Sequence, residues 1–480
     1  MSTDSFVPTA TLKRTLQPRW VFAIALGSAV GWGAFILPFD WLAAGGLGGT
    51  LLGFLIGGAL IAVIAMSYGA VIRALPVTGG GVAFALASLG RVHAFVAGWC
   101  LTLGYAGIVA LNASAMSLVF RMAMPDLMMQ LKLYSVAGWD IYLPEVIVSV
   151  LFLLIFAWIN ARGVALSGRL QFLACVIMLL AVTAIMIAAG AYFMTGATPI
   201  PPAFPADVSP VAAIATIVAF APWAYVGFDN VPQTAGEFNF SPRKALALLL
   251  WGVVAATFIY MAMTVATAIA VGDQPELYAD TAWPPAVAIT GIAGPIGMIL
   301  MLIAVSMGVL TGLNGFYVST SRVLLTMGRA KMLPRAFAAL HPRHGTPVVG
   351  IAFTLLICVV TPWFGRAALL WIVDMTSFGI TVAYFYTCYC AFQLGRSGRL
   401  PGMTSQQASS AGLQATGLIG CAFAVIFMLL LLVPGSPGAL GAPSLIALGA
   451  WIVMGVVFFL ARRKSYLSTS DEELHRSVFH

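Results

Sequence analysis

Long apolar runs alternate with short polar segments along the whole chain. Runs of about 18 or more predominantly apolar residues predict transmembrane helices. Twelve such spans are predicted, near residues 20–44, 47–72, 94–119, 143–160, 168–194, 211–233, 244–271, 289–323, 347–364, 367–393, 412–433 and 444–461. We therefore predict an all-α integral membrane protein with twelve transmembrane helices.

The placement of basic residues supports this number of spans. Cytoplasmic loops collect Lys and Arg, whereas external loops do not. With both termini in the cytoplasm, all but three of the 23 Lys and Arg residues fall on the inner side, the exceptions being Arg121, Lys132 and Arg366. The net charge of +8 is then an orientation signal, and it gives no reason to expect a nucleic-acid partner. We expect a protein of the inner, or plasma, membrane.

Composition and motifs narrow the function classes further. Of the 480 residues 61% are hydrophobic and 8% are charged. The segments between the predicted spans are too short for a soluble catalytic domain. The sequence has no GxxxxGK[ST] phosphate loop, so we expect transport driven by gradients rather than by ATP. All six cysteines lie in predicted spans, and neither a metal site nor a cofactor is indicated. We therefore expect that the protein is not an enzyme.

The first span contains three glycines, Gly27, Gly31 and Gly33, where a helix crossing lipid has no reason to break. Glycine adopts unusual dihedrals, so this run predicts an interruption that frees N–H and C=O groups at bilayer depth. A broken helix near the midplane is typical of the substrate site of secondary transporters. The alternative is that these small residues only allow close helix packing.

The sixth span predicts a second interruption. Pro222 removes an intrahelical hydrogen bond, Gly227 permits an irregular turn, and Asp229 places a carboxylate close to mid-span. The two breaks are five spans apart, which favours two inverted five-helix repeats. We predict repeats over residues 20–205 and 206–395, helices 11 and 12 in 396–461, and cytoplasmic segments at 1–19 and 462–480.

Several sequence blocks resemble the amino acid, polyamine and organocation (APC) permease family, which has a leucine-transporter-type fold. Residues 27–35 resemble its GSxxGxGxF segment, and residues 227–237 resemble its GFDxVxxxAEE segment. Residues 321–347 resemble the SRxLxxMARDGxLPxxFxxxHPxxxTP stretch. The ordered set covers roughly residues 15–395, and its order and spacing make it specific.

This resemblance assigns candidate roles. The freed amides of the first break, together with Ser28, suit a substrate carboxylate, because helix N-termini hold anions. Asp229 is a candidate for proton coupling, since ionisable residues within spans are functional by default; it could instead cap a helix. Trp223 resembles the aromatic gate of the agmatine antiporter type, or it is a packing residue. The predicted substrate-binding residues are Gly27, Ser28, Ala29, Val30, Gly31, Trp32, Gly33, Phe220, Trp223, Ala224 and Gly227.

Two positions depart from the family pattern. Gly236 stands where the family often has the first of two glutamates, and Met178 stands where several members have a buried lysine implicated in proton coupling. The second departure argues against lysine-based coupling.

We therefore predict a secondary active transporter that moves an amino acid or related amine by alternating access, with proton symport as the leading mechanism. Exchange of one solute for another is the alternative within transport, and a non-transporting amino acid sensor is the alternative outside it. We expect a monomer or loose dimer in the lipid bilayer.

Overall fold

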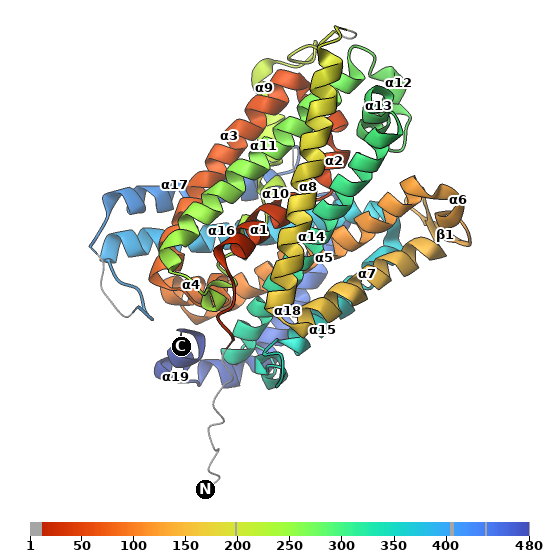
Figure 1. Cartoon of the computed structure of the whole chain (residues 1–480). Coiled ribbons are helices and arrows are strands. Elements are labelled where there is room, and N and C mark those ends of the chain that lie inside the picture. The colour runs from red at the N-terminus through yellow and green to blue at the C-terminus, as the bar shows by residue number, and fades with distance from the viewer. Residues whose placement is uncertain (1–11, 197–198, 404–407, 437–438, 480) are drawn as a thin grey trace.

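The computed structural model describes residues 12–196, 199–403, 408–436 and 439–479. Residues 1–11 of the predicted N-terminal segment, and residue 480 of the predicted tail, lie outside the described residues. The described chain is a bundle of helices with one short β-hairpin, β1 and β2 (Figure 1).

The helices of the first half include two long ones, α3 and α5, and several short ones around breaks and loops. Their bounds are α1 Pro18–Ala29, α2 Gly33–Ile36, α3 Pro38–Ala74, α4 Gly80–Leu89, α5 Arg91–Ala123, α6 Pro125–Met128, α7 Leu143–Arg162 and α8 Val164–Phe193, with β1 Lys132–Val136 and β2 Trp139–Tyr142 before α7.

The second half begins with the short helices α9 and α10 and contains several long ones, of which α14 is the longest. Its α-helices are α9 Pro210–Ala219, α10 Ala221–Ala224, α11 Ala245–Val271, α12 Glu276–Ala279, α13 Pro284–Ala293, α14 Pro295–Arg329, α15 Val348–Cys358, α16 Gly365–Ser397, α17 Ala411–Leu432, α18 Ala442–Leu467 and α19 Asp471–Phe479. Its 3-10 helices are η1 Phe228–Asn230, η2 Ala235–Glu237, η3 Pro242–Lys244, η4 Arg335–Ala338 and η5 Thr361–Phe364.

Eight helices of the described part are long and apolar enough to cross a membrane. The protein is therefore an integral membrane protein. Span one is divided among α1, α2 and the start of α3, and span six among α9, α10 and η1, so neither span is a single helix of the kind counted here. The full number of twelve and the inverted repeat stay predictions.

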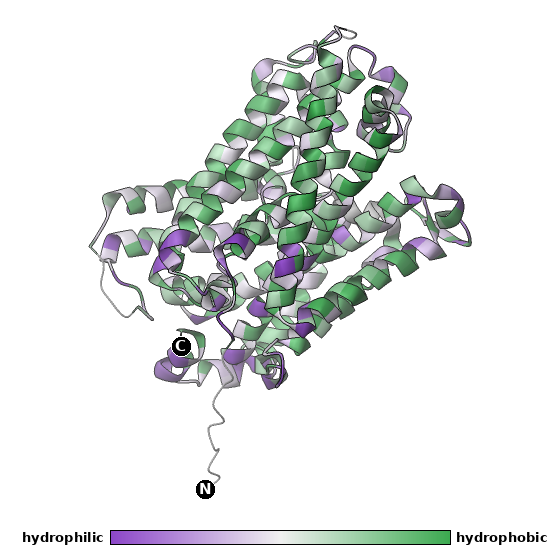
Figure 2. Cartoon of the chain, viewed as in Figure 1, coloured by the Kyte–Doolittle hydropathy of each residue, from purple (hydrophilic) through white to green (hydrophobic). Residues whose placement is uncertain are grey.

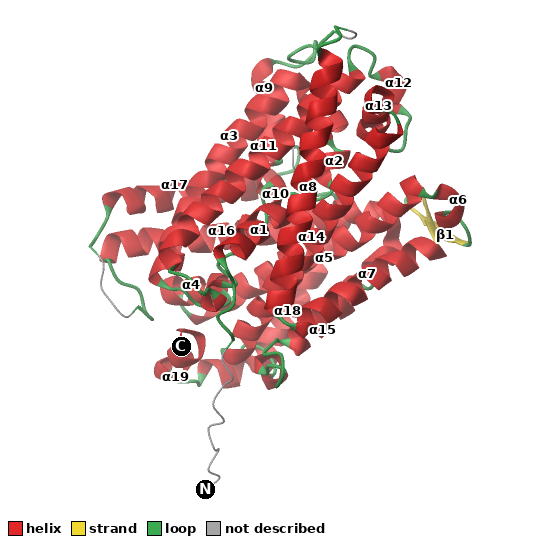
Figure 3. Ribbon diagram, in the orientation of Figure 1, coloured by secondary structure: helices red, strands yellow, loops and turns green. Residues whose placement is uncertain are grey.

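The interrupted first span lies at the centre of the bundle. Helix α1 packs against α8, α11 and α14, and α14 in turn packs against α5 and α8. Helix α3 packs against α9 and α11, while α16 packs against α5 and α17. Figure 3 shows the interruptions as short loop segments within the bundle, near α2 and α10.

Polar residues gather where the chain begins and ends. Figure 2 shows predominantly hydrophobic residues along the helices and a concentration of hydrophilic residues around α19 and the first described residues. We call this end of the bundle the terminal end, and the end with α12, α13 and the β-hairpin the opposite end (Figure 1). The β-hairpin is fixed by Arg121, whose Nη1 donates to Glu145 at 3.0 Å and whose guanidinium lies over the Trp139 ring at 4.4 Å.

The C-terminal helix α19 lies across the terminal end. Arg91, at the start of α5, donates to the carbonyl of Thr469 and to the Asp471 carboxylate, both at 2.6 Å. Lys331, just after α14, pairs with Glu473 at 2.6 Å. Phe479 is buried against Gly402, where an added Cβ would lie 2.5 Å from the phenyl ring. The last helix therefore connects α5, α14 and the segment after α16.

We expect Arg91→Ala to release α19, because the carbonyls after α18 and the Asp471 carboxylate lose a shared donor. Amide hydrogen exchange of residues 471–479 should accelerate about tenfold, while the exposed Arg463→Ala should leave it unchanged. The pKa of Asp471 is lowered by the hydrogen bond from Arg91. The contribution of this pair to docking is therefore present at neutral pH and is lost as pH falls through that lowered pKa. Unchanged exchange in the Arg91 variant would show that α19 is held by its apolar face alone.

Candidate functional site

The first helix break falls where the glycines predict it. Helix α1 ends at Ala29, Val30 leaves the helical region with φ −102° and ψ 86°, and α2 begins at Gly33. The helix then continues through Leu37, whose dihedrals are helical, into α3. Within the described part of the chain, the amides of Gly31, Trp32 and Gly33 have no hydrogen-bond acceptor. This break therefore presents unpaired N–H donors at the start of a helical segment.

The second break directly touches the first. Helix α10 ends at Ala224, and Gly227 has φ 132°, a conformation that L side chains rarely adopt. A Cβ at Gly227 would overlap the backbone of Ser28 and lie 2.5 Å from the amide nitrogen of Ala29. Only glycine allows this approach, so the two interrupted helices meet backbone to backbone.

The chain after Gly227 is not a second α-helical half, contrary to a simple splitting of the sixth span. Residues 228–237 form two short 3-10 helices, η1 and η2, separated by turns. Pro232 lacks a backbone N–H, and Gly79 and Gly80 donate to the carbonyls of Gln233 and Pro232 at 2.9 and 3.3 Å. These bonds to the loop after α3 replace those that a continuous helix would form.

One tyrosine hydroxyl lies within hydrogen-bonding distance of both breaks. The hydroxyl of Tyr260, on α11, lies 2.9 Å from the carbonyl oxygen of Ala29 and 2.8 Å from that of Ala224. These are the last residues of α1 and α10, where helical carbonyls lose their partners. The ring is 2% exposed and stacks on Phe54 at 5.0 Å with an interplanar angle of 9°. Tyr260 thus ties the two helix ends to the scaffold.

Several buried polar groups around the breaks have unused hydrogen-bonding capacity. Ser28 Oγ, Trp32 Nε1, Asn112 Oδ1 and both side-chain polar atoms of Asn230 have no hydrogen-bond partner among the described residues. Ser28 and Asn230 lie together, because a Cβ at Gly315 on α14 would overlap Ser28 Oγ and lie 3.6 Å from Asn230 Nδ2, and Asn112 lies beside Gly312, one turn earlier on α14. Buried polar groups are normally paired, so this cluster suits a polar ligand.

Asp229 is completely buried and is held from two sides. Its Oδ1 accepts from the Gly227 amide at 2.8 Å, and its Oδ2 accepts from the Tyr105 hydroxyl at 2.7 Å. Gln233 Nε2 donates to the same hydroxyl at 3.1 Å. The carboxylate therefore stabilises the turn at the second break and links it to α5, and both of these donors are neutral groups.

Trp223 lies against the first break. Its ring occupies the space that a Cβ at Gly33 would overlap, and its centroid is 6.0 Å from that of Trp32 in an edge-to-face arrangement. On the same side of the breaks, the Trp283 indole donates to the Phe35 carbonyl at 3.0 Å. Phe220 differs from the other predicted substrate-binding residues in its exposure, because it is 41% exposed at the end of α9. Its role stays a prediction.

An ion pair and a backbone bridge hold the segment beyond the second break on the side of the terminal end. Arg322 on α14 donates twice to the Glu237 carboxylate, at 2.8 and 3.1 Å, and both side chains are 1% exposed. Leu16 forms a short parallel bridge with Phe238, its amide donating to the Glu237 carbonyl at 3.0 Å. Gly236 is the residue that departs from the family pattern. A Cβ there would overlap Thr78 Oγ1, so glycine lets the loop after α3 pack closely.

Met178, the second residue that departs from the family pattern, lies in the interior of the bundle. It is fully buried on α8, one of the helices that pack against α1. Two turns or so before it, Gln171 donates to the carbonyls of Ala23 and Thr311, both at 3.1 Å. This face of α8 therefore contacts α1 through amide and apolar groups.

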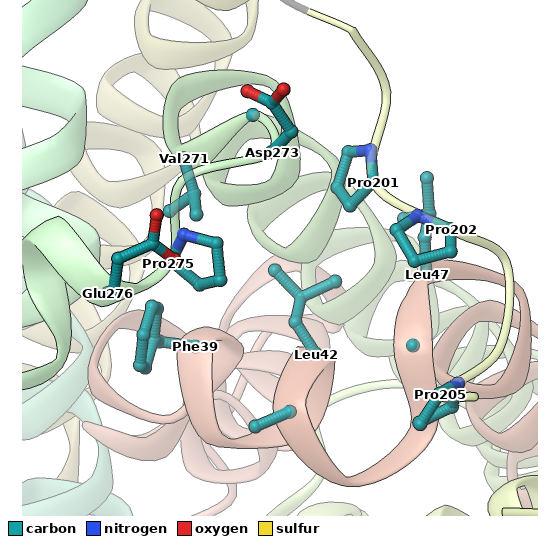
Figure 4. Close-up of a pocket in the computed structure, with 13 residues that line it drawn as sticks. Phe39, Leu42, Leu47, Pro201, Pro202, Pro205, Val271, Asp273, Pro275 and Glu276 are labelled. Atoms are coloured by element: carbon teal, nitrogen blue, oxygen red, sulfur yellow. The ribbon is translucent and has the colours of Figure 1, made fainter. Parts of the chain in front are cut away.

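A separate cavity of about 420 Å³ lies at the opposite end, between the start of α3, the segment before α9 and the end of α11. Figure 4 shows Phe39, Leu42 and the prolines around it, with Asp273 and Glu276 at its edge. None of the predicted site residues line this cavity. The candidate site is therefore the closed cluster at the two breaks.

Comparison with known sequences agrees with this architecture. The sequence model of the family described as amino acid permease matches residues 16–459. The chain belongs to the amino acid permease family. The resemblance found in the sequence blocks is thereby confirmed, and the protein is an amino acid transporter of the membrane rather than an enzyme.

Three relatives illustrate the proteins to which this chain is similar. An uncharacterised transporter of Rhizobium meliloti is 27% identical over 364 residues, which are 73% of this permease and 72% of the relative. The branched-chain amino acid permease BcaP of Lactococcus lactis is 24% identical over 94% and 95% of the two chains. L-asparagine permease 1 of Mycobacterium bovis is 26% identical over 82% and 79%.

Sequence reasoning did not identify Tyr260, Tyr105, Asn112 or Asn230. A signal existed for Asn112, because a polar amide within an otherwise apolar span is costly unless it has a partner or a ligand. Nothing in the local sequence distinguishes Tyr260 or Tyr105 from packing tyrosines. Their partners lie on other helices, more than one hundred residues away for the Tyr260 bond to Ala29.

The two glycines of the first break should respond differently to a methyl group. Gly33→Ala would force the Trp223 ring away, whereas a Cβ at Gly31 would lie 3.7 Å from Asn112 Oδ1, an ordinary contact. We expect at least a tenfold loss of uptake for Gly33→Ala and near-normal uptake for Gly31→Ala, at matched expression. Equal uptake by the two variants would contradict the contact between Trp223 and the break.

Tyr260→Phe should separate hydrogen bonding from packing at the helix ends. The phenyl ring keeps the stack on Phe54, but the carbonyls of Ala29 and Ala224 lose the single hydroxyl hydrogen that they share, which costs about 1–3 kcal/mol. We expect reduced thermal stability and weaker substrate binding. Tyr389→Phe, on α16, serves as the control, because the Tyr389 hydroxyl forms no hydrogen bond with another described residue. A wild-type melting temperature for Tyr260→Phe would mean that the two carbonyls are satisfied in another way.

Proposed function

We propose that this permease moves a neutral amino acid across the plasma membrane by alternating access, with the two helix breaks as its substrate site. The observation that carries the proposal is the set of unused donors at the first break. The amides of Gly31, Trp32 and Gly33 precede a helical segment, where the helix dipole favours an anion. A substrate carboxylate would bind there together with Ser28.

The surroundings favour a substrate without net charge on its side chain. Asn112 and Asn230 offer amide groups, Trp32 and Trp223 offer aromatic faces, and Asp229 is already engaged by Gly227 and Tyr105. A substrate ammonium can be held by helix carbonyls and amide oxygens. The names of the relatives, branched-chain amino acid permease and L-asparagine permease, agree with a neutral amino acid.

Alternating access requires a closure on each side of the site. Toward the opposite end, Trp223 packs on Gly33; toward the terminal end, the pair of Arg322 and Glu237 and the bridge at Leu16 close the path. We propose that both closures are present in this conformation, which is therefore occluded. In our proposal the terminal end faces the cytoplasm, as the distribution of basic residues predicts.

Proton symport is the coupling we propose, with Asp229 as the coupling carboxylate. Its two acceptor oxygens contact the second break and α5, so a change of protonation would alter hydrogen bonds at the substrate site. Exchange remains the alternative, because Met178 occupies the position of the family's coupling lysine. Trans-side substrate stimulates an exchanger, whereas a pH gradient alone drives a symporter.

Uptake by proteoliposomes tests the proposal. Labelled neutral, acidic and basic amino acids are compared with and without a pH gradient, and accumulation of a neutral one driven by the gradient is expected. Asp229→Asn keeps an acceptor for the Gly227 amide, so it should bind substrate and exchange it while failing to accumulate it. Asp374→Asn, whose carboxylate accepts from Ser444 on α18, is the control. Wild-type accumulation by Asp229→Asn would remove this residue from the mechanism.

A further inference from the structure

A small cavity of about 190 Å³ opens at the terminal end, away from the helix breaks. Three segments form it: residues 13–15 before α1, the junction of α7 and α8, and the loop that precedes α15. The buried pair of Arg322 and Glu237 lies at its inner wall. The cavity therefore brings together the N-terminal segment, two scaffold elements and the closure of the terminal end.

The charge of this cavity is unbalanced. Lys13, Arg162, Arg322 and Arg343 line it, and Glu237 is the lining carboxylate, already bound twice by Arg322. Lys13, Arg162 and Arg343 form no ion pair with any residue in the described ranges. Three cations from three separate segments thus converge without a counter-charge.

His344 lines the same cavity, beside these cations. Its pKa is lowered by partial desolvation and, beyond that, by His341, Arg162, Arg343 and Lys13. The cations of the three segments are therefore close enough to act on the same group.

The backbone adds donors to the same wall. Helix α8 begins at Val164 directly after Gly163, which has φ 131° and no side chain to cap the helix. Val164 and Ala165 line the cavity at the N-terminus of this 30-residue helix. Helix N-termini favour anions, and guanidinium groups bind oxyanions through paired N–H donors.

We propose that this cavity binds a phosphate group, either inorganic phosphate or the phosphomonoester headgroup of a lipid, and that the bound group holds the terminal end closed. A tetrahedral dianion has enough acceptor oxygens to be bound by Lys13, Arg162 and Arg343 together. Lys13 is three residues before Leu16, which is bonded to the Glu237–Asn239 segment. A phosphate therefore ties the segment before α1 to α7, α8 and α15. The closure, but not the binding, rests on the proposed alternating-access function.

Thermal unfolding of the full-length protein tests the binding. Inorganic phosphate is titrated at constant ionic strength against chloride, and a saturable rise in the melting temperature is expected. The double variant Lys13→Gln/Arg343→Gln should weaken apparent binding at least tenfold. Arg14→Gln/Arg335→Gln removes the same charge from exposed positions outside this cavity and should bind as the wild type does.

A second arm distinguishes the source of the phosphate. The protein is placed in phosphatidylcholine nanodiscs with or without phosphatidic acid, in buffer free of phosphate. Stabilisation by phosphatidic acid alone supports the headgroup, and stabilisation by inorganic phosphate alone supports the free anion. Stabilisation by neither, or equal stabilisation of both double variants, overturns the site.

The closure is measured without transport. Amide exchange of residues 12–20 should slow when phosphate is added to the wild type and to the exposed-charge control, but not to Lys13→Gln/Arg343→Gln. Binding without slower exchange would leave the site standing and overturn the closure. A failure of amino acid uptake in proteoliposomes, by contrast, would overturn the proposed function and leave the phosphate titration as it is.

Discussion

A peptide group buried away from water must find a hydrogen-bond partner, and the two broken helices of this permease are arranged around that constraint. Ending α1 and α10 inside the bundle exposes carbonyls, and the Tyr260 hydroxyl lies within bonding distance of the last one on each helix. The turn at Gly227 frees an amide, which donates to Asp229. The amides at the start of α2 have no protein partner in the described chain, which is why we propose a substrate carboxylate as their partner.

The rest of the interior is shaped so that these breaks can meet. Gly227 allows the second break to contact Ser28, and Gly308 and Gly315 allow α14 to approach the first break closely, while Gly312 makes room for the Asn112 side chain. A side chain at any of these glycines would meet backbone or buried polar atoms. Because of the same close approach, the side-chain amide groups of Asn112 and Asn230 lie beside the breaks.

The parts of this arrangement that depend on local sequence could be predicted. Glycine in an apolar span, and proline with glycine in another, predict interruptions because their backbone properties are intrinsic. The residues that stabilise the interruptions could not be predicted in this way, since Tyr260 and Tyr105 act through long-range contacts. The irregular course after Gly227 likewise depends on bonds to the loop at Gly79, and the docking of α19 depends on Arg91, at the other end of the chain.

The position of Asp229 explains why we propose it as the coupling carboxylate. An ionised carboxylate accepts at both oxygens, as it does here from Gly227 and Tyr105. Protonation converts one oxygen into a donor, which neither the Gly227 amide nor a hydroxyl already donating to it can accommodate without rearranging. Because Gly227 contacts the backbone of Ser28, such a rearrangement would reach the first break directly. In the proposed mechanism, proton and substrate would then act on one pair of touching backbones, which gives a direct physical route for coupling between two ligands.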